Sequence, residues 1–234
     1  MIDNKFLSCI VIAAGSGSRM ASEINKPYID LGGRKVLEIT LDTVCSIDEI
    51  DELILVIRRG DEEFLEEFLN KYDKKIRVIY GSSTRELSTF EGLKALDPRT
   101  KLLITHDGVR PFATRELFYK VIDALSTNKA VVSAVKTKDT VKIVDENMYV
   151  DFTPNRDFVY SIQTPQGFDK DLLYSMYEDY INSEFKVTDD SGLFEFYKRK
   201  EGVKVLEGEY SNFKITTKED IIFARAYIEE KENV

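Results

Sequence analysis

Short apolar runs rich in β-branched residues alternate along the first part of this chain with segments whose apolar positions recur at helical spacing. The runs are CIVIA at 9–13, LILVI at 53–57, IRVIY at 76–80, KLLITH at 101–106 and AVVSAV at 130–135. Between them, apolar side chains three or four positions apart predict helices at Phe64, Leu65, Phe68, Leu69 and Tyr72 and at Leu117, Phe118, Val121, Ile122 and Leu125. Runs that are apolar throughout are typical of strands buried on both faces of a parallel sheet. We therefore predict an α/β fold with a mostly parallel sheet and flanking helices.

The rhythm changes between 137 and 168, where the pieces TVKIVDEN, MYVDFTPNRD and FVYSIQTPQGF resemble short strands separated by turn residues. This pattern predicts an inserted β-arm. A projecting hairpin cannot bury both of its faces alone, so we expect the arm to pack on a second subunit. The alternative is a lid that covers the site of its own chain.

The last third of the chain predicts helices near 170–182 and 190–200, a strand at VKVLEG and a final helix. Thr217 is the expected N-cap of that helix, with Asp220 three residues later favouring the helix N-terminus. No Pro/Gly/Ser-rich linker, repeat or low-complexity run divides the sequence. We therefore expect residues 1–234 to form a single domain with the β-arm inserted.

Charge and composition exclude several classes of protein. The formal net charge of −9 argues against non-specific nucleic-acid binding, which needs clustered Lys and Arg. No apolar run approaches the roughly 20 residues that span a bilayer, and the N-terminus lacks a secretory pattern, so we expect a cytoplasmic protein. Cys9 and Cys45 are expected to be reduced packing residues. The single histidine, His106, excludes a multi-histidine zinc site and is expected to be structural.

The segment CIVIAAGSGSRM, at 9–20, places a strand directly before a small-residue loop that ends in an arginine. Gly15 and Gly17 allow backbone N–H groups to approach phosphate oxygens, and Arg19 adds a fixed charge with forked donors. The loop lacks the third glycine of a dinucleotide fingerprint and the Gly-Lys-Ser/Thr end of a Walker loop. It is a candidate phosphate loop, and the alternative is a tight turn with a solvated arginine.

Polar side chains follow three of the predicted strands at the points where the strands end. They occupy 15–19 after the first strand, 81–88 after the third and 107–110 after the fourth. Parallel sheets bind ligands at the carboxyl ends of their strands. The pattern therefore predicts one site at this edge of the sheet.

Six segments in this order, AAGSGSRM, HDGVRPF, KDTVK, IQTPQGF, TDDS and NFKITTKED, resemble the cytidylyltransferases that act on 2-C-methyl-D-erythritol 4-phosphate. The resemblance spans nearly the whole chain. It implies a Rossmann-like domain whose β-arm builds a homodimer, with CTP as substrate and Mg²⁺ or another divalent cation as cofactor. The implied reaction is attack of a sugar-alcohol phosphate on the α-phosphate of CTP, with release of pyrophosphate.

The resemblance also implies roles for individual residues, carried over by position. The catalytic cations would be Arg19, Lys26 and Lys214. CTP would be bound by Ala13, Ala14, Gly15, Gly17, Gly81 and Ser88. The acceptor would be held by Asp107, which also lies near the metal, and by Arg110, Thr140, Arg156, Thr164 and Thr188. Ser88 could equally be a helix-start hydroxyl, Asp107 a strand-end turn residue, and Thr164 and Thr188 ordinary loop or cap hydroxyls.

Three departures from the family pattern leave other interpretations open. The usual Pro-Lys-Gln reads Asn25-Lys26-Pro27, the usual Gly-Gly reads Gly81-Ser82, and Thr89 stands where an apolar residue is common. The alternatives are a ribitol-5-phosphate cytidylyltransferase, a non-catalytic nucleotide-binding paralogue and, on fold class alone, a nicotinamide-dependent oxidoreductase.

Overall fold

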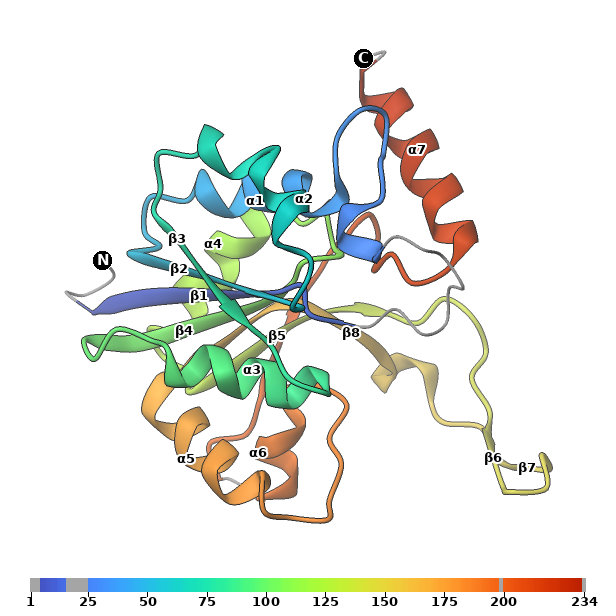
Figure 1. Cartoon of the computed structure of the whole chain (residues 1–234). Coiled ribbons are helices and arrows are strands. Elements are labelled where there is room, and N and C mark those ends of the chain that lie inside the picture. Colours follow the sequence, from blue (N-terminus) through green and yellow to red (C-terminus); the bar gives the residue numbers. More distant parts are fainter. Residues whose placement is uncertain (1–4, 16–24, 198–199, 233–234) are drawn as a thin grey trace.

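A central sheet organises the computed structural model of this chain, which describes residues 5–15, 25–197 and 200–232 (Figure 1). Its seven strands lie in the order β3-β2-β1-β4-β8-β5-β9. Their bounds are β1 Phe6–Ile12, β2 Glu52–Ile57, β3 Ile76–Tyr80, β4 Thr100–Asp107, β5 Ala130–Lys136, β8 Tyr160–Asp169 and β9 Lys204–Glu207. All five apolar runs of the first part of the sequence, and VKVLEG, are strands of this sheet, as predicted.

The sheet is mostly parallel, which confirms the predicted fold class. Strand β1 pairs in parallel with β2 and β4, β2 with β3, and β5 with β9. Only β8 runs antiparallel to its neighbours β4 and β5. The predicted end of the β-arm, at about 168, is wrong, because β8 is a strand of the central sheet. Gln163 to Phe168 are buried, because this part of the strand lies between two others in the sheet.

Helices cover both faces of the sheet, as Figure 1 shows. On one face, α1 (Val36–Cys45), α2 (Glu62–Glu66) and α4 (Arg115–Ala124) enclose an apolar core, and on the other lie α3 (Arg85–Lys94), α5 (Lys170–Tyr180) and α6 (Gly192–Phe196). Strand β1 serves both cores, since Cys9 and Val11 belong to the first and Ile10 and Ile12 to the second. This two-sided burial explains why the strands are apolar throughout.

Two predicted helices are shorter than their apolar spacing suggests. The helix expected from Phe64 to Tyr72 is the single turn α2 followed by a 3₁₀ turn, η2 (Leu69–Lys71). Phe68 has φ −139°, which interrupts the helix, yet its ring remains buried in the core. The helix expected over 190–200 is limited to α6.

The last helix, α7 (Lys218–Glu232), begins as predicted. Thr217 Oγ1 accepts a hydrogen bond from the backbone N–H of Asp220 at 3.4 Å, and the Asp220 carboxylate accepts one from the backbone N–H of Thr217 at 2.8 Å. This reciprocal pair is a capping box.

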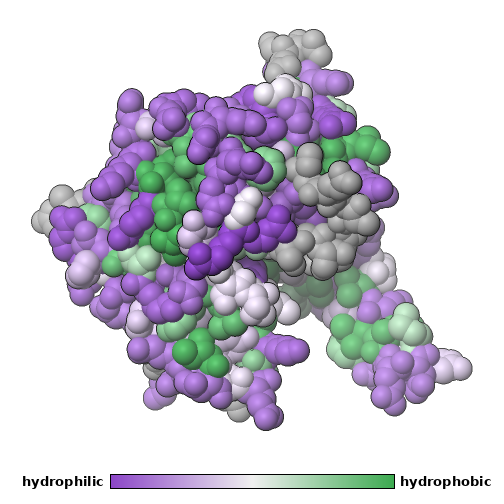
Figure 2. Space-filling model, viewed as in Figure 1, coloured by the Kyte–Doolittle hydropathy of each residue, from purple (hydrophilic) through white to green (hydrophobic). Residues whose placement is uncertain are grey.

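A two-stranded hairpin, β6 (Ile143–Val144) and β7 (Val150–Phe152), projects from the body at the lower right of Figure 1. The 3₁₀ turn η3 (Arg156–Phe158) leads back to β8. Large apolar side chains are exposed along this arm; Met148 is 78% and Phe158 82% accessible. Figure 2 shows them as a green patch on the projection.

Cys9 and Cys45 are free thiols, as predicted. Within the described ranges, none of the helices combines the length and the apolar character needed to traverse a bilayer.

Candidate active site

The carboxyl ends of the parallel strands meet at one edge of the sheet, as the sequence predicted. Ile12, the last residue of β1, pairs with Asp107, the last residue of β4. The N–H of Gly108 donates to the Ile12 carbonyl at 2.9 Å, and the N–H of Gly81, just after β3, donates to the Ile57 carbonyl at the end of β2 at 2.8 Å. The segments at 13–15, 81–88 and 107–110 are therefore neighbours in space.

The turn after β3 packs directly on the segment after β1. A methyl group at Gly81 would lie 2.4 Å from Cβ of Ala14 and 2.7 Å from Oγ of Ser88, so this position requires glycine. The Ser88 hydroxyl is buried, donates to the Thr84 carbonyl at 2.7 Å and accepts from the Ser82 N–H at 3.0 Å. These bonds hold the turn at the start of α3, which is the helix-start role that the sequence left open for Ser88.

The candidate phosphate loop is described only in part. Ala13 and Ala14 are buried at the end of β1, and Gly15 is exposed. Gly17 and Arg19, predicted to bind CTP and to act in catalysis, lie outside the described residues.

Lys26 opens the 3₁₀ turn η1 (Lys26–Tyr28) and is only 9% exposed. The residue before it is tied to the start of α2, because Asn25 Nδ2 donates to Oδ2 of the buried Asp61 at 2.8 Å. The Tyr28 ring stacks on Phe64 of α2, with ring centres 4.9 Å apart. Two contacts with the α2 segment thus fix the residues on either side of Lys26.

Asp107 is the centre of a cluster of cations. Its carboxylate oxygens lie 3.0 Å from Lys214 Nζ, 3.2 Å from Arg85 Nε and 3.3 Å from Arg110 Nε. Burial alone would raise the pKa of the Asp107 carboxyl, but the charges of Arg85, Lys214 and Arg110 outweigh burial and hold that pKa far below its usual range. The structure therefore brings together three of the predicted residues, Asp107, Arg110 and Lys214.

Behind this cluster lies a buried ion pair that the sequence analysis missed. Arg85 Nη1 and Nη2 donate to the two oxygens of Asp190 at 2.9 and 3.2 Å. Asp190 also accepts hydrogen bonds from Thr105 Oγ1 at 2.7 Å and Tyr177 OH at 2.5 Å. Arg85 thus links Asp190 to Asp107. Arg85 and Asp190 lie in two segments that the sequence had indicated, 81–88 and TDDS. Nothing in their spacing along the chain predicted that they form an ion pair.

Thr164 joins the site through the hydrogen bonds of its hydroxyl. Its oxygen accepts from the Asp107 N–H at 3.0 Å, which leaves its proton to donate to Nδ1 of His106, also at 3.0 Å. The other ring nitrogen of His106, Nε2, then carries the proton and faces the Arg110 carbonyl at 3.4 Å. His106 is fully buried in this network, and burial lowers its pKa to about 4.

A cavity of about 350 Å³ opens beside the Asp107 cluster. Five predicted residues line it: Asp107, Arg110, Thr164, Thr188 and Lys214. Thr140 and Arg156, also predicted to hold the acceptor, do not line it. Both are exposed near the arm, where Arg156 Nη1 donates to the Lys138 carbonyl at 3.1 Å. Within one chain, the structure does not bring these two residues to the site.

The model of the 2-C-methyl-D-erythritol 4-phosphate cytidylyltransferase family matches residues 7–230. The chain belongs to this family. The enzyme of that name from Caldanaerobacter subterraneus subsp. tengcongensis is 34% identical over 95% of this chain and 98% of its own length. The one from Alkaliphilus metalliredigens is 38% identical over 97% and 95%.

Two solved structures are similar to this chain over nearly its whole length. The crystal structure of 4-diphosphocytidyl-2C-methyl-D-erythritol synthase from Anaerococcus prevotii is 67% identical, with a TM-score of 0.91 and coverage of 97% of this chain and 98% of that one. The 2-C-methyl-D-erythritol 4-phosphate cytidylyltransferase from Thermus thermophilus is 25% identical, with a TM-score of 0.76.

The carboxylates of the site determine whether this family member can hold a divalent cation. Among the described residues, no group of three or more His, Cys, Asp or Glu side chains is placed to hold a metal ion. Asp190 is enclosed by Arg85, Thr105 and Tyr177. Asp107 is paired with Arg85, Arg110 and Lys214 but also lines the cavity, together with the carboxylates of Asp189 and Glu195. Mg²⁺ needs only one or two protein carboxylates at a phosphate site, because it keeps several waters and takes its other ligands from substrate phosphates. The donor set therefore fits Mg²⁺ carried by a nucleotide.

Proposed function

We propose that this protein transfers CMP from CTP to 2-C-methyl-D-erythritol 4-phosphate, forming 4-diphosphocytidyl-2-C-methyl-D-erythritol in isoprenoid precursor biosynthesis. One observation supports this most directly. In a chain of this family, Lys214, Arg85 and Arg110 converge within 3.3 Å of Asp107, at the sheet edge that also holds Ala14 and Gly81. A chain with net charge −9 gathers cations there, which is what a site for two phosphorylated substrates requires.

The chemistry needs no covalent intermediate. An oxygen of the acceptor phosphate attacks the α-phosphorus of CTP, and the bond between that phosphorus and the bridging oxygen of the β-phosphate breaks to release pyrophosphate. The acceptor is already an anionic nucleophile, so the protein has to align the two substrates and stabilise charge on the equatorial oxygens. Lys26 and Lys214, together with Arg19, are proposed to supply that charge.

Asp107 is the residue proposed to hold Mg²⁺, which when bound neutralises charge on the phosphates of the nucleotide. Arg85 and Arg110 fix the position of the Asp107 carboxylate. The close packing of Gly81 on Ala14 fixes the end of β1, where we propose that the nucleotide binds. Thr164, Thr188 and Arg110 line the cavity proposed for the acceptor.

The arm supports a second proposal, that two chains form a homodimer and share each site. Met148, Tyr149, Phe152 and Phe158 are exposed on the hairpin, and a subunit contact would bury them. Arg156 stands on the same segment, away from the Asp107 cavity of its own chain. We therefore propose that Arg156 acts in the site of the partner subunit.

The test of the reaction is pyrophosphate release from CTP and Mg²⁺ with methylerythritol phosphate or ribitol 5-phosphate at subsaturating concentration, so that rates report kcat/KM. We expect methylerythritol phosphate to be clearly preferred. Lys214→Ala should lower kcat far more than it weakens CTP binding. Lys129→Ala, which removes an exposed lysine paired with Asp169, serves as the control. Preference for ribitol 5-phosphate, or wild-type turnover by Lys214→Ala, contradicts the proposal.

Sharing of the site is tested by co-expressing the Arg156→Ala and Lys214→Ala chains. Each variant alone should be inactive. In a mixed dimer, one of the two sites receives wild-type residues at both positions, so random assembly restores about a quarter of wild-type activity. If each arm serves its own chain, the mixture stays inactive.

A further inference from the structure

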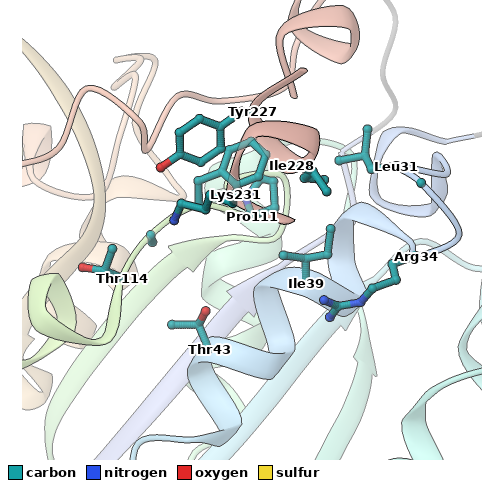
Figure 3. Close-up of a pocket in the computed structure, with 12 residues that line it drawn as sticks. Leu31, Arg34, Ile39, Thr43, Pro111, Thr114, Tyr227, Ile228 and Lys231 are labelled. Carbon is teal, nitrogen blue, oxygen red and sulfur yellow. The ribbon is translucent and has the colours of Figure 1, made fainter. Parts of the chain in front are cut away.

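A second cavity lies between α1, the segment after Arg110 and α7 (Figure 3). Its volume is about 320 Å³, and it shares no lining residue with the Asp107 cavity. Figure 3 shows Ile39 and Thr43 of α1 on one side of this space and Tyr227, Ile228 and Lys231 of α7 on the other. Leu31, Phe112 and Ala113 complete an apolar wall. The size is at the lower end of the range for ligand sites, about 300–1,000 Å³.

The apolar cluster beneath this cavity is incompletely covered. Its buried members are Leu31, Val36, Phe112, Ile215 and Ala224. They are outnumbered by the half-buried apolar residues packed on them, Ile29, Ile39, Val109, Phe213, Ile221, Tyr227 and Ile228. In the two main cores the buried residues are the majority. Apolar surface therefore remains available where the cavity opens.

The charged residues of the lining are both cations. Among the described residues that form it, Arg34 and Lys231 are charged and none is a carboxylate, although the whole chain carries a net charge of −9. Arg34 is already paired with Asp42 and Glu38. Lys231 Nζ lies over the Tyr227 ring, 4.9 Å from its centre. Lys231 is thus the cation that can meet a ligand charge beside the apolar wall.

We propose that this cavity binds a small amphipathic monoanion, with a slender apolar body against Ile39, Phe112 and Ile228 and a carboxylate near Lys231 Nζ. Decanoate represents this class, because it combines a flexible chain with a single charge at one end. Burial of the chain supplies most of the binding free energy, and the ammonium group selects the sign of the charge.

The cavity lies behind the residues proposed to act on the substrates. Phe112 follows Arg110 by two positions, and its ring packs on Phe213, the residue before Lys214, with centres 5.3 Å apart. Phe112 also packs on Tyr227 at 4.8 Å. A ligand in the cavity therefore contacts the aromatic group that supports Arg110 and Lys214.

The first test is calorimetric titration of the full chain with decanoate and with decyltrimethylammonium, which has the same chain length and the opposite charge. We expect one site for decanoate and at least about tenfold weaker binding of the cation. Lys231→Gln should weaken decanoate binding about fivefold or more. Lys94→Gln is the matched control, because Lys94 Nζ lies 5.3 Å from the Phe90 ring on α3, across the sheet, and it should change nothing.

The second test places the ligand in the cavity. The chain has no tryptophan, so Tyr227→Trp introduces a single reporter in the wall, and decanoate should shift its emission. Ile39→Trp, which fills the space, should abolish binding in a chain whose circular dichroism is unchanged. If Ile39→Trp does not fold, the proposal is tested by decanoate binding to Lys231→Gln and by the emission of Tyr227→Trp.

Four results overturn the proposal: no decanoate binding, equal affinity for both amphiphiles, several equivalent sites, or equal effects of Lys94→Gln and Lys231→Gln. A different number of subunits in the assembly formed by Ile39→Trp, compared with the wild type, also overturns it, because the cavity would then be a contact between copies of this chain.

Discussion

His106 is the only histidine of the chain, so its protonation can be followed by a single imidazole NMR signal. His106 is fully buried, its Nδ1 accepts from Thr164, and its Nε2–H faces the Arg110 carbonyl. The Phe118 ring lies 5.0 Å away. Burial lowers the pKa of His106 to about 4, and the attraction of Asp107 offsets burial only in part. Acidification is the perturbation that tests this environment.

The size and sign of the effect follow from linkage. In the unfolded chain the imidazole binds a proton below about pH 6.5, whereas in the native state it does so only near pH 4. Between these values the unfolded state holds more protons, so the free energy of unfolding falls as the pH falls. In total, protonation of His106 should lower the free energy of unfolding by about 3 kcal/mol between neutral pH and about pH 4. The lowered pKa values of Asp107 and Asp190 act in a separate window, below about pH 4.

The assay is urea unfolding followed by circular dichroism, between about pH 7 and about pH 4.5, for the wild type and for His106→Gln. The wild type should lose stability across this range more steeply than the variant, which has no imidazole to protonate. A proton NMR titration of the lone imidazole measures its pKa directly. A titration midpoint near the ordinary histidine value, or equal pH slopes of stability for the two chains, would contradict a buried, neutral His106.

Three further predictions concern groups around the site. Asp190→Asn should lower the free energy of unfolding, measured in urea, by about 3–5 kcal/mol, because it leaves the buried Arg85 without its charged partner. Asp171→Asn, at an exposed ion pair, should lower it by less than about 1 kcal/mol. Equal losses in the two variants would count against a stabilising role of the buried pair. Gly81→Ala should lower kcat/KM for CTP about tenfold or more, because its methyl group would lie 2.4 Å from a neighbouring carbon, and unchanged kinetics would exclude the close approach. Asp61→Asn should lower kcat about tenfold with KM values nearly constant, because it loosens the anchor beside Lys26; a change in KM alone would contradict this.

The sequence predicted the central strands and the sheet edge at which the polar segments meet, because these depend on local signals. A strand buried on both faces must be apolar at every position, so the runs at 53–57 and 130–135 were recognisable without a structure. The cap at Thr217 is equally local, because both partners lie within one turn. The position of β8 in the sheet could not be predicted from local signals, because its insertion between β4 and β5 depends on pairing with strands distant in the sequence.

The same distinction applies to the site. Motifs indicated Asp107, Arg110 and Lys214, since each is a polar residue in a segment that resembles the family pattern, and the structure brings them together. Arg85 and Asp190 carried no signal of their own, because an ion pair between residues 105 positions apart exists only when the chain is folded.

From the order of amino acids alone we could recognise the alternation of strands and helices, the sheet edge where the polar segments gather, and the family. The folding of the chain determines which charges meet. It placed three cations on Asp107, left Arg156 on an arm away from that cluster, and opened an apolar cavity behind Phe112. Apolar periodicity is set by neighbours along the chain, whereas the distance between two charges is set by how the elements pack.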